Sequence, residues 1–143
     1  MDRRYRIRQV ANCLNLATPL GLLISTVGGA TRERGPDGLI LAFGYRFGFP
    51  VAGAFTVGNV VLTKRRELDE KLVRHEARHA TQWACCVGLP MLPLYLLAML
   101  ASVAICGHQA SCNVFERLAG LDDGGYPRTP PRWRRRPGGD QQQ

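Results

Sequence analysis

The feature that most constrains the fold of this chain is a stretch of more than 20 residues, 83–106, without a charged side chain. Such a stretch is long enough to cross a bilayer, and it can equally form the buried central helix of a small domain. Gly88, Pro90 and Pro93 break this stretch, so the continuous helix that remains is only marginally long for a span. The uncharged apolar segment after the first two breaks covers residues 91–106. We expect a helix over this segment, and both a membrane-associated and a cytoplasmic protein remain open.

The segment before it, residues 66–87, predicts an amphipathic helix. Its apolar residues share one broad face and its basic residues share the opposite face, as in a helix that packs on a core. Acidic residues gather near its start, where the positive end of the helix dipole favours them. The apolar face consists of Leu68, Leu72, Val73, Ala77, Ala80, Trp83 and Ala84.

Within this predicted helix, the segment His75–His79 matches the pattern H-E-x-x-H. Residues four apart lie on one face of a helix, so both imidazoles can bind one metal ion. Glu76 is turned by about 100° from the first histidine and can hydrogen-bond a metal-bound water without being a ligand. It also falls within the apolar arc, where a carboxylate is costly unless it is paired or near a metal. The pattern therefore predicts a metal site.

A catalytic zinc ion takes three protein ligands and keeps one position for water, so a third ligand must come from elsewhere. Glu116 is the best candidate because it lies in a predicted short helix over residues 111–120, with Ser111 or Asn113 as the cap. The alternative for Glu116 is a surface carboxylate that pairs with Arg117 or with the basic tail. The remaining candidates are His108, as the reserve, Asp122, Asp123 and the cysteines.

The N-terminal part of the chain predicts a helix and a turn. Residues 10–30 are apolar and predict a helix that is retained in the protein. A cleaved secretory signal is the less favoured alternative, because two asparagines and a proline interrupt the apolar region. Residues 31–38 combine charges with Gly-Pro-Asp-Gly, which is typical of a turn.

Residues 39–63 are rich in Phe, Tyr, Val and Gly and predict the strands of a small sheet, with Pro50 as a break. The segment from Ala54 to Thr63 predicts one strand, or two short strands flexed at Gly58. Helices and sheet together predict one α+β domain over residues 1–126.

The chain carries 19 Lys and Arg residues against 11 Asp and Glu residues, a formal net charge of +8. This balance favours an anionic partner, either a membrane surface or nucleic acid. A membrane surface is favoured over nucleic acid, since no binding motif and no basic sheet with interleaved aromatic residues is evident. Much of the charge lies in the termini, and the tail of residues 127–143 is disordered by its composition of Pro, Arg, Gly and Gln.

The five cysteines fit no C-x-x-C pattern, and their odd number leaves at least one thiol free. Four of the five lie in apolar surroundings, where cysteine behaves as a small buried hydrophobic residue. We therefore expect buried cysteines, as in a reducing, cytosol-facing compartment. The five residues are Cys13, Cys85, Cys86, Cys106 and Cys112.

With H-E-x-x-H at His75–His79 and N-x-x-E-x-x-A at Asn113–Ala119, the chain resembles the gluzincin zinc metallopeptidases. The likeness extends from about residue 52 to residue 120. It is closest to small, mostly uncharacterised bacterial proteins with metallopeptidase domains. In those proteins a similar strand precedes the H-E-x-x-H helix, and a glutamine often follows the second histidine by three residues, as Gln82 does here.

The resemblance implies zinc bound by His75, His79 and Glu116, with Glu76 as the general base and a peptide or protein as the substrate. It implies a minimal zincin-like domain with a small sheet, the H-E-x-x-H helix, an apolar helix and a short helix that bears the glutamate. Candidate donors to the oxyanion are Tyr126, His108 and Tyr95, of which Tyr126 follows a flexible Gly-Gly pair.

The chain departs from the gluzincin pattern four residues after Glu116. Many gluzincins carry there an aspartate that orients a ligand histidine, whereas this chain has Gly120, and Asp122 or Asp123 would have to substitute. Two other functions therefore remain open: a non-catalytic, membrane-associated metal-binding protein, and a basic nucleic-acid-binding module.

Overall fold

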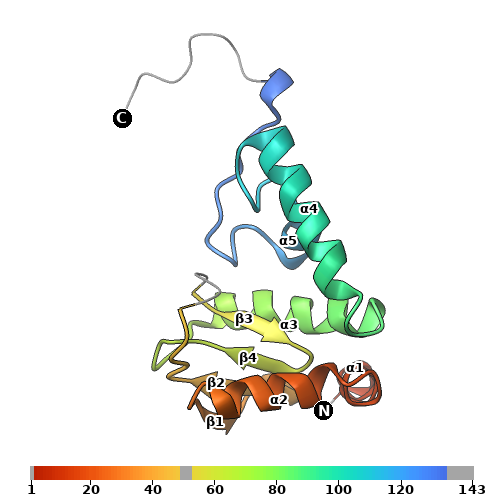
Figure 1. The fold of residues 1–143 in the computed structure, drawn as a ribbon, viewed down its shortest axis with the longest axis vertical. Coiled ribbons are helices and arrows are strands. Elements are labelled where there is room, and N and C mark those ends of the chain that lie inside the picture. The colour runs from red at the N-terminus through yellow and green to blue at the C-terminus, as the bar shows by residue number, and fades with distance from the viewer. Residues whose placement is uncertain (1, 49–52, 135–143) are drawn as a thin grey trace. The chain divides into compact units, whose positions relative to one another are not determined.

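The structure is a computed structural model that describes residues 2–48 and 53–134. Within these residues it contains five α-helices and a four-stranded sheet, which confirms the predicted α+β class (Figure 1). The chain divides into two compact units, Met1–Leu92 and Pro93–Gln143.

The first unit begins with two helices, α1 (Arg3–Leu14) and α2 (Ala17–Val27), so the prediction of one helix over residues 10–30 is wrong. The two axes are bent by 74°. At the break, the side chain of Asn15 accepts a hydrogen bond from the backbone N–H two residues ahead (3.0 Å), and Leu16 adopts a left-handed φ of 65°. Apolar composition could not reveal this local bond, which ends the first helix.

Among the described residues, no single helix is long and apolar enough to cross a membrane. In the part of the chain that the structure describes, only α1 and α2, taken together as a bent pair, reach the required length and composition.

The sheet has the strand order β1-β2-β4-β3, with a parallel β2–β4 pair between two antiparallel pairs. Its strands are β1 (Thr31–Arg34), β2 (Ile40–Phe43), β3 (Phe55–Val57) and β4 (Val60–Leu62). The prediction of a turn over residues 31–38 is thus wrong for β1, and only the short 3₁₀ turn η1 (Pro36–Gly38) fits it. The charges of β1 mislead because an exposed edge strand tolerates them.

The strands β3 and β4 form a hairpin, which confirms the prediction of two short strands flexed at Gly58. Gly58 has a φ of 63°, and a Cβ at this position would lie 2.5 Å from the backbone carbonyl carbon of Ala17. The turn therefore needs glycine both for its conformation and for its close approach to α2. Pro50, the predicted break, lies outside the described residues.

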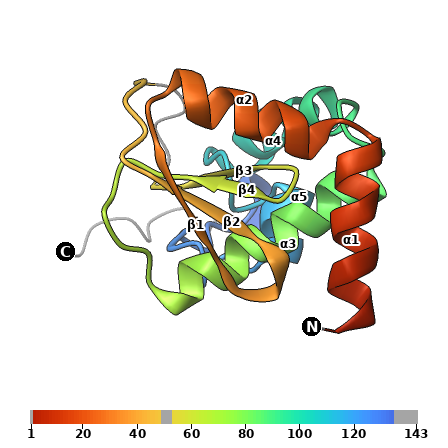
Figure 2. The same ribbon diagram turned by 90° about the horizontal axis from the view of Figure 1, so that it is seen from below.

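The sheet lies between α2 and α3 (Glu70–Cys85), as Figures 1 and 2 show. On the α2 side, Gly21 approaches Val60 closely enough that no larger residue would fit there. On the α3 side, a buried cluster joins sheet and helix. It consists of Leu39, Ala54, Val61 and Ala80, with Leu41, Leu68, Leu72, Val73 and Ala77 packed against it.

Two polar side chains of α1 and that of its C-cap residue, Asn15, spaced at helical intervals, donate hydrogen bonds to backbone carbonyls of α3. The pairs are Arg8 with Ala77 (3.2 Å), Asn12 with Ala80 (2.8 Å) and Asn15 with Trp83 (3.4 Å). Burial lowers the pKa of the Arg8 guanidinium, and the nearby Asp37 opposes this shift. The asparagines that interrupt the apolar N-terminal sequence therefore have a structural purpose, because they fix the position of α3.

The second unit contains most of α4 (Met91–Cys106), which has the predicted bounds, and α5 (Val114–Ala119), which lies within the predicted residues 111–120. It also contains a short 3₁₀ turn, η2 (Arg132–Arg134). Residues 127–134, predicted to be disordered, make hydrogen bonds instead, including one from Ser111 Oγ to the carbonyl of Pro127 (2.6 Å). The rest of the predicted tail, residues 135–143, lies outside the described residues.

The prediction that the cysteines are buried and hydrophobic is wrong for most of them. Cys106 and Cys112 form a disulfide, because the chain turns back after α4 and brings their Cα atoms to 6.1 Å. Cys13 and Cys85 are exposed, and Cys86 is half-buried. Burial, together with the neighbouring Cys85, raises the pKa of the Cys86 thiol.

Candidate metal centre

The helix α3 places both histidines of the H-E-x-x-H motif on one buried face. It begins at Glu70 because the side chain of Asp69 caps it by accepting a hydrogen bond from the N–H of Leu72 (2.8 Å). The side chains of His75 and His79 follow one turn apart, and both are buried. A pair of buried imidazoles on one face provides two ligands that the helix itself holds in register.

Hydrogen bonding fixes which nitrogen of His79 is available to a metal. Its Nδ1 lies 2.8 Å from Oε1 of Gln82, an acceptor, so Nδ1 carries the proton and Nε2 keeps its lone pair. That Nε2 lies 3.0 Å from Nε2 of His75. Two ligands of a tetrahedral zinc ion are separated by roughly 3.3 Å, so the spacing of these two nitrogens fits a shared cation.

The third predicted ligand, Glu116, lies on the short helix α5. The side chain of Asn113 caps this helix by accepting a hydrogen bond from the N–H of Phe115 (3.0 Å), as the sequence predicts. The hydroxyl of Tyr95, on α4, donates a short hydrogen bond to Oε1 of Glu116. Glu116 is only 2% exposed, which contradicts the alternative of a surface carboxylate.

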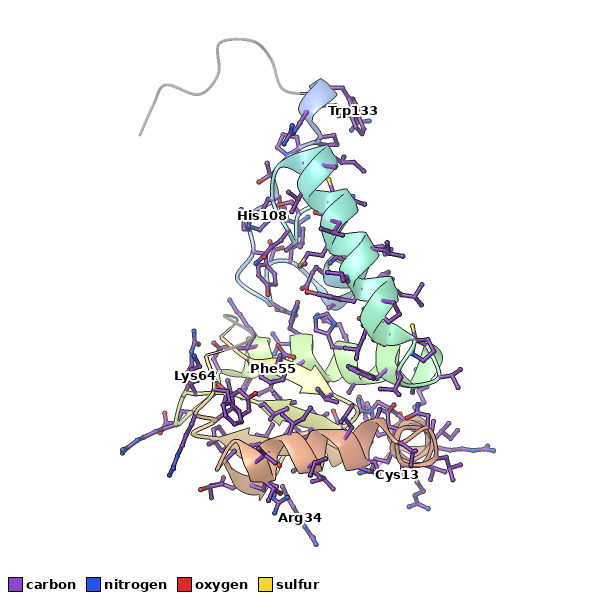
Figure 3. The ribbon with its side chains drawn as sticks, in the orientation of Figure 1. Cys13, Arg34, Phe55, Lys64, His108 and Trp133 are labelled. Carbon is purple, nitrogen blue, oxygen red and sulfur yellow. A yellow bond between two sulfur atoms is a disulfide. The ribbon has the colours of Figure 1, made fainter. Side chains whose placement is uncertain are left out.

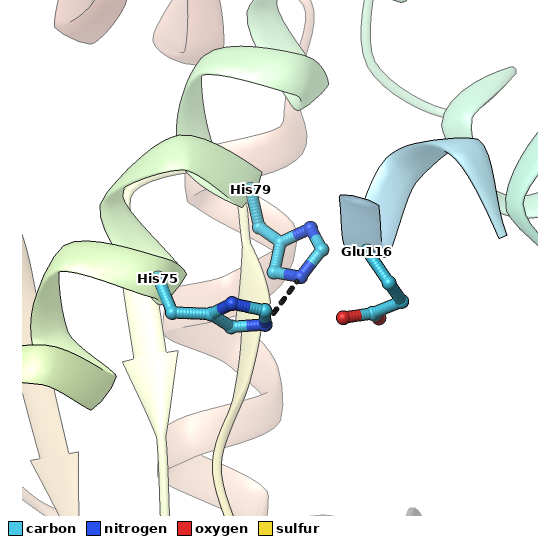
Figure 4. Close-up of side chains that lie close together, drawn as sticks. All are labelled: His75, His79 and Glu116. Atoms are coloured by element: carbon cyan, nitrogen blue, oxygen red, sulfur yellow. Dashed lines mark hydrogen bonds between the residues drawn. The ribbon is translucent and has the colours of Figure 1, made fainter. Parts of the chain in front are cut away.

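The three predicted ligands form one group. Ligand atoms of His75, His79 and Glu116 lie within 4.8 Å of one another, and all three residues are buried (Figure 4). Two imidazoles and a carboxylate are a donor set that zinc prefers. This group could therefore hold a metal ion.

Glu76 lies on the neighbouring face of α3 and is buried, as its place in the apolar arc predicts. The hydroxyl of Thr56, on β3, donates a hydrogen bond to its Oε2 (2.7 Å). The backbone carbonyl of Thr56 in turn accepts one from the indole N–H of Trp83 (2.7 Å). Thr56 thus joins β3 to α3 through two hydrogen bonds, one of which holds the carboxylate of Glu76 in one orientation.

The reserve ligand His108 lies elsewhere in the second unit. Its Nδ1 accepts hydrogen bonds from the backbone N–H groups of Ala110 (3.2 Å) and Ser111 (3.3 Å). A neutral ring that accepts at Nδ1 carries its proton on Nε2, which leaves no lone pair for a metal. The His108 ring instead lies beside that of Tyr126, with the ring centroids 6.4 Å apart.

The two aspartates that might replace the missing gluzincin aspartate follow α5. Asp122 is exposed and forms an ion pair with Arg128, which raises the pKa of the Arg128 guanidinium. Asp123 is half-buried. At the family position itself, Gly120 ends α5 with a φ of 91°, a conformation that favours glycine over aspartate.

Sequence reasoning missed two residues of this centre and did not predict the partner of a third. Thr56 and Trp83 carry no local signal, because their contacts join segments that are far apart in the chain. Tyr95 is predicted as a donor to the oxyanion, whereas it donates to Glu116.

No family model matches the chain, and none of the curated proteins or solved structures compared with it is significantly similar.

Proposed function

We propose that this chain is a small zinc metallopeptidase that binds zinc through His75, His79 and Glu116. The observation that carries the proposal is the buried group of two imidazoles and one carboxylate within 4.8 Å. Two histidines and a glutamate, with one position left for water, recur in catalytic zinc sites. When bound, zinc would polarise a peptide carbonyl and lower the pKa of a water molecule to about 7.

Glu76 is the general base of the proposed reaction. Its carboxylate takes a proton from the attacking water and returns it to the leaving amine. The Thr56 hydroxyl donates a hydrogen bond to Oε2 of this carboxylate (2.7 Å) and thereby orients the side chain. Thr56 is therefore a positioning residue that acts through Glu76.

The oxyanion of the reaction needs a hydrogen-bond donor in addition to the metal. Because the Tyr95 hydroxyl donates to Glu116, its proposed role is to orient that ligand. Tyr126 stays the proposed donor, since it follows the Gly-Gly pair that would let its phenol approach a substrate. His108 is the alternative donor, through the N–H of its Nε2.

Elemental analysis of the purified chain tests the metal, with about one zinc per chain as the expected result. Absence of any transition metal, together with no uptake of added zinc, would contradict the proposal.

Hydrolysis of a fluorogenic casein tests the reaction. The variant Glu76→Gln should keep its zinc and lose hydrolysis, because the amide cannot accept the proton. Thr56→Val should keep its zinc and lower kcat with little change in KM, because it removes the hydroxyl that donates to the carboxylate and to the backbone carbonyl of Glu76. If both variants lose zinc, Glu76 is a ligand and the assigned roles are incorrect.

A non-catalytic metal-binding protein is the second candidate, and the same measurements distinguish it. In that case the wild type would bind zinc but hydrolyse casein no faster than the background rate. Glu76→Gln would then change neither the zinc content nor the rate.

A further inference from the structure

Helix α4 has an unusual distribution of polar and apolar residues. Its inner face carries polar groups that bond within the second unit: Ser102 donates to the carbonyl of His108 (2.6 Å) and accepts from the N–H of Cys112 (2.9 Å). Tyr95 donates to Glu116 from the same face. Its outer face is exposed and consists of leucine and valine, the reverse of a helix that faces water.

The exposed apolar side chains of α4 form a stripe. At 100° per residue, Leu92, Leu96, Leu100 and Val103 fall within an arc of about 80°, with Leu97 beside it. Each of these five side chains is at least 44% exposed, and α4 contains no charged residue. A contiguous apolar surface of this kind marks an interaction site rather than scattered surface leucines.

The C-terminal end of this stripe adjoins a basic and aromatic turn. The guanidinium of Arg132, in η2, donates to the backbone carbonyl of Val103 (3.5 Å). Arg132 and Arg134 are exposed, and Trp133 between them is 72% exposed and lies near the end of α4 (Figure 3). Two further arginines, Arg135 and Arg136, follow in the sequence.

We propose that the outer face of α4 and the Arg132–Arg134 turn insert together into the surface of an anionic lipid bilayer. Tryptophan prefers the membrane–water interface, where its ring is apolar and its N–H stays hydrated. Arginines beside it attract anionic headgroups, while an adjacent leucine face enters the acyl region. A protein partner would account for the exposed leucines alone. A bilayer accounts for the leucines of α4 and also for the tryptophan and the arginines that lie next to them in the second unit.

The test is cosedimentation of the full chain with vesicles of phosphatidylcholine alone or with 30% phosphatidylglycerol added. The wild type should bind the anionic vesicles and bind the neutral vesicles at least about tenfold more weakly. Leu96→Gln/Leu100→Gln should lower the partition coefficient on anionic vesicles by at least about tenfold. Its matched control, Leu14→Gln/Leu23→Gln, changes two exposed leucines of α1 and α2 and should bind like the wild type.

Two further readouts separate the bilayer from other occupants. Trp133 fluorescence should shift to shorter wavelength with anionic vesicles, and Trp133→Phe should abolish the shift. If the wild type ignores vesicles but dimerises, and Leu96→Gln/Leu100→Gln makes it monomeric, the face binds a second copy and the proposal is overturned. Equal loss of vesicle binding in the control variant would overturn the assignment to α4. None of these results depends on the zinc site, so the two proposals succeed or fail separately.

Discussion

The two helices that carry the proposed zinc ligands are held in place in different ways. Helix α3 has 16 residues and is fixed along its length, by the core of the first unit, by two side chains of α1 and by the side chain of Asn15, which caps α1. Helix α5 has six residues, and a cap at Asn113 and a disulfide at Cys112 hold its start. Helix α3 is thus a long helix packed on a sheet, and α5 is a short helix with a cap and a covalent bond at its start.

This difference predicts where each half of the site is vulnerable. An isolated helix shorter than about 12 residues is marginal in water, so α5 depends on its local ties. The histidines on α3 should keep their geometry when one distant contact is lost. The position of Glu116 should be more sensitive to the loss of a single interaction, because a six-residue helix has few turns over which other contacts can hold it.

The largest expected effect is on the histidine half of the site. His75→Ala and His79→Ala should each reduce zinc from about one per chain to nearly none, because each removes one of three ligands. The matched control is His108→Ala, since His108 carries its proton on the nitrogen that would have to ligate. Zinc content after dialysis, measured by mass spectrometry, decides the point. Loss of zinc in His108→Ala but not in His79→Ala would show that the third ligand and the H-E-x-x-H motif are misassigned.

The next effect concerns the glutamate half. Glu116→Gln keeps the size of the side chain but removes its charge, so zinc should bind more than about 100-fold more weakly. This loss exceeds the roughly 10- to 100-fold that follows when a residue that only orients a metal ligand is removed. Competition with a fluorescent chelator measures the dissociation constant. Asp122→Asn is the control, because it changes an exposed carboxylate of the same unit. If both variants bind zinc equally well, Glu116 is not a ligand.

Much of the site could be predicted because its signals are local. The spacing of His75 and His79 fixes their common face through the helix alone. The carboxylate of Glu76 inside an apolar arc correctly predicts a buried group. Asn113 followed by an apolar run correctly predicts the start of α5.

The wrong and missing predictions concern interactions between segments that are far apart in the sequence, or structure that forms only when two strands or two cysteines pair. The charged residues 31–34 form a strand only because β2 pairs with them. The hydrogen bond from Thr56 to Glu76 joins a strand to a helix, and nothing near Thr56 in the sequence indicates it. Cys106 and Cys112 pair because of a turn that composition does not reveal, and the expectation of buried cysteines fails with them.

A smaller effect should follow from removing the disulfide. Cys106→Ser/Cys112→Ser opens the loop that precedes α5, and the chain-entropy model gives a loss of about 2 kcal/mol in the free energy of unfolding. Urea unfolding followed by circular dichroism measures it, with Cys13→Ser as the control for replacing an exposed cysteine. An unchanged midpoint would mean that the cap and the hydrogen bonds of Ser102 suffice to hold the loop.

The smallest expected effect is that of Tyr95→Phe, and it distinguishes the two halves most directly. The substitution removes one hydroxyl and leaves the ring, which packs near Phe115 with a centroid distance of 5.9 Å. The hydrogen bond to Glu116 is lost, so zinc affinity should fall by about tenfold, as for other partners that orient a metal ligand.

The control for this variant is Tyr126→Phe, whose hydroxyl is proposed to act on the substrate and not on the metal. Tyr126→Phe should bind zinc like the wild type and lower kcat, whereas Tyr95→Phe should change both zinc affinity and hydrolysis at limiting zinc. Excess zinc should restore hydrolysis in Tyr95→Phe, because the remaining defect is one of metal binding. If Tyr95→Phe binds zinc normally and stays inactive in excess zinc, its hydroxyl serves the reaction rather than the ligand. The short helix would then hold Glu116 in place without that hydrogen bond.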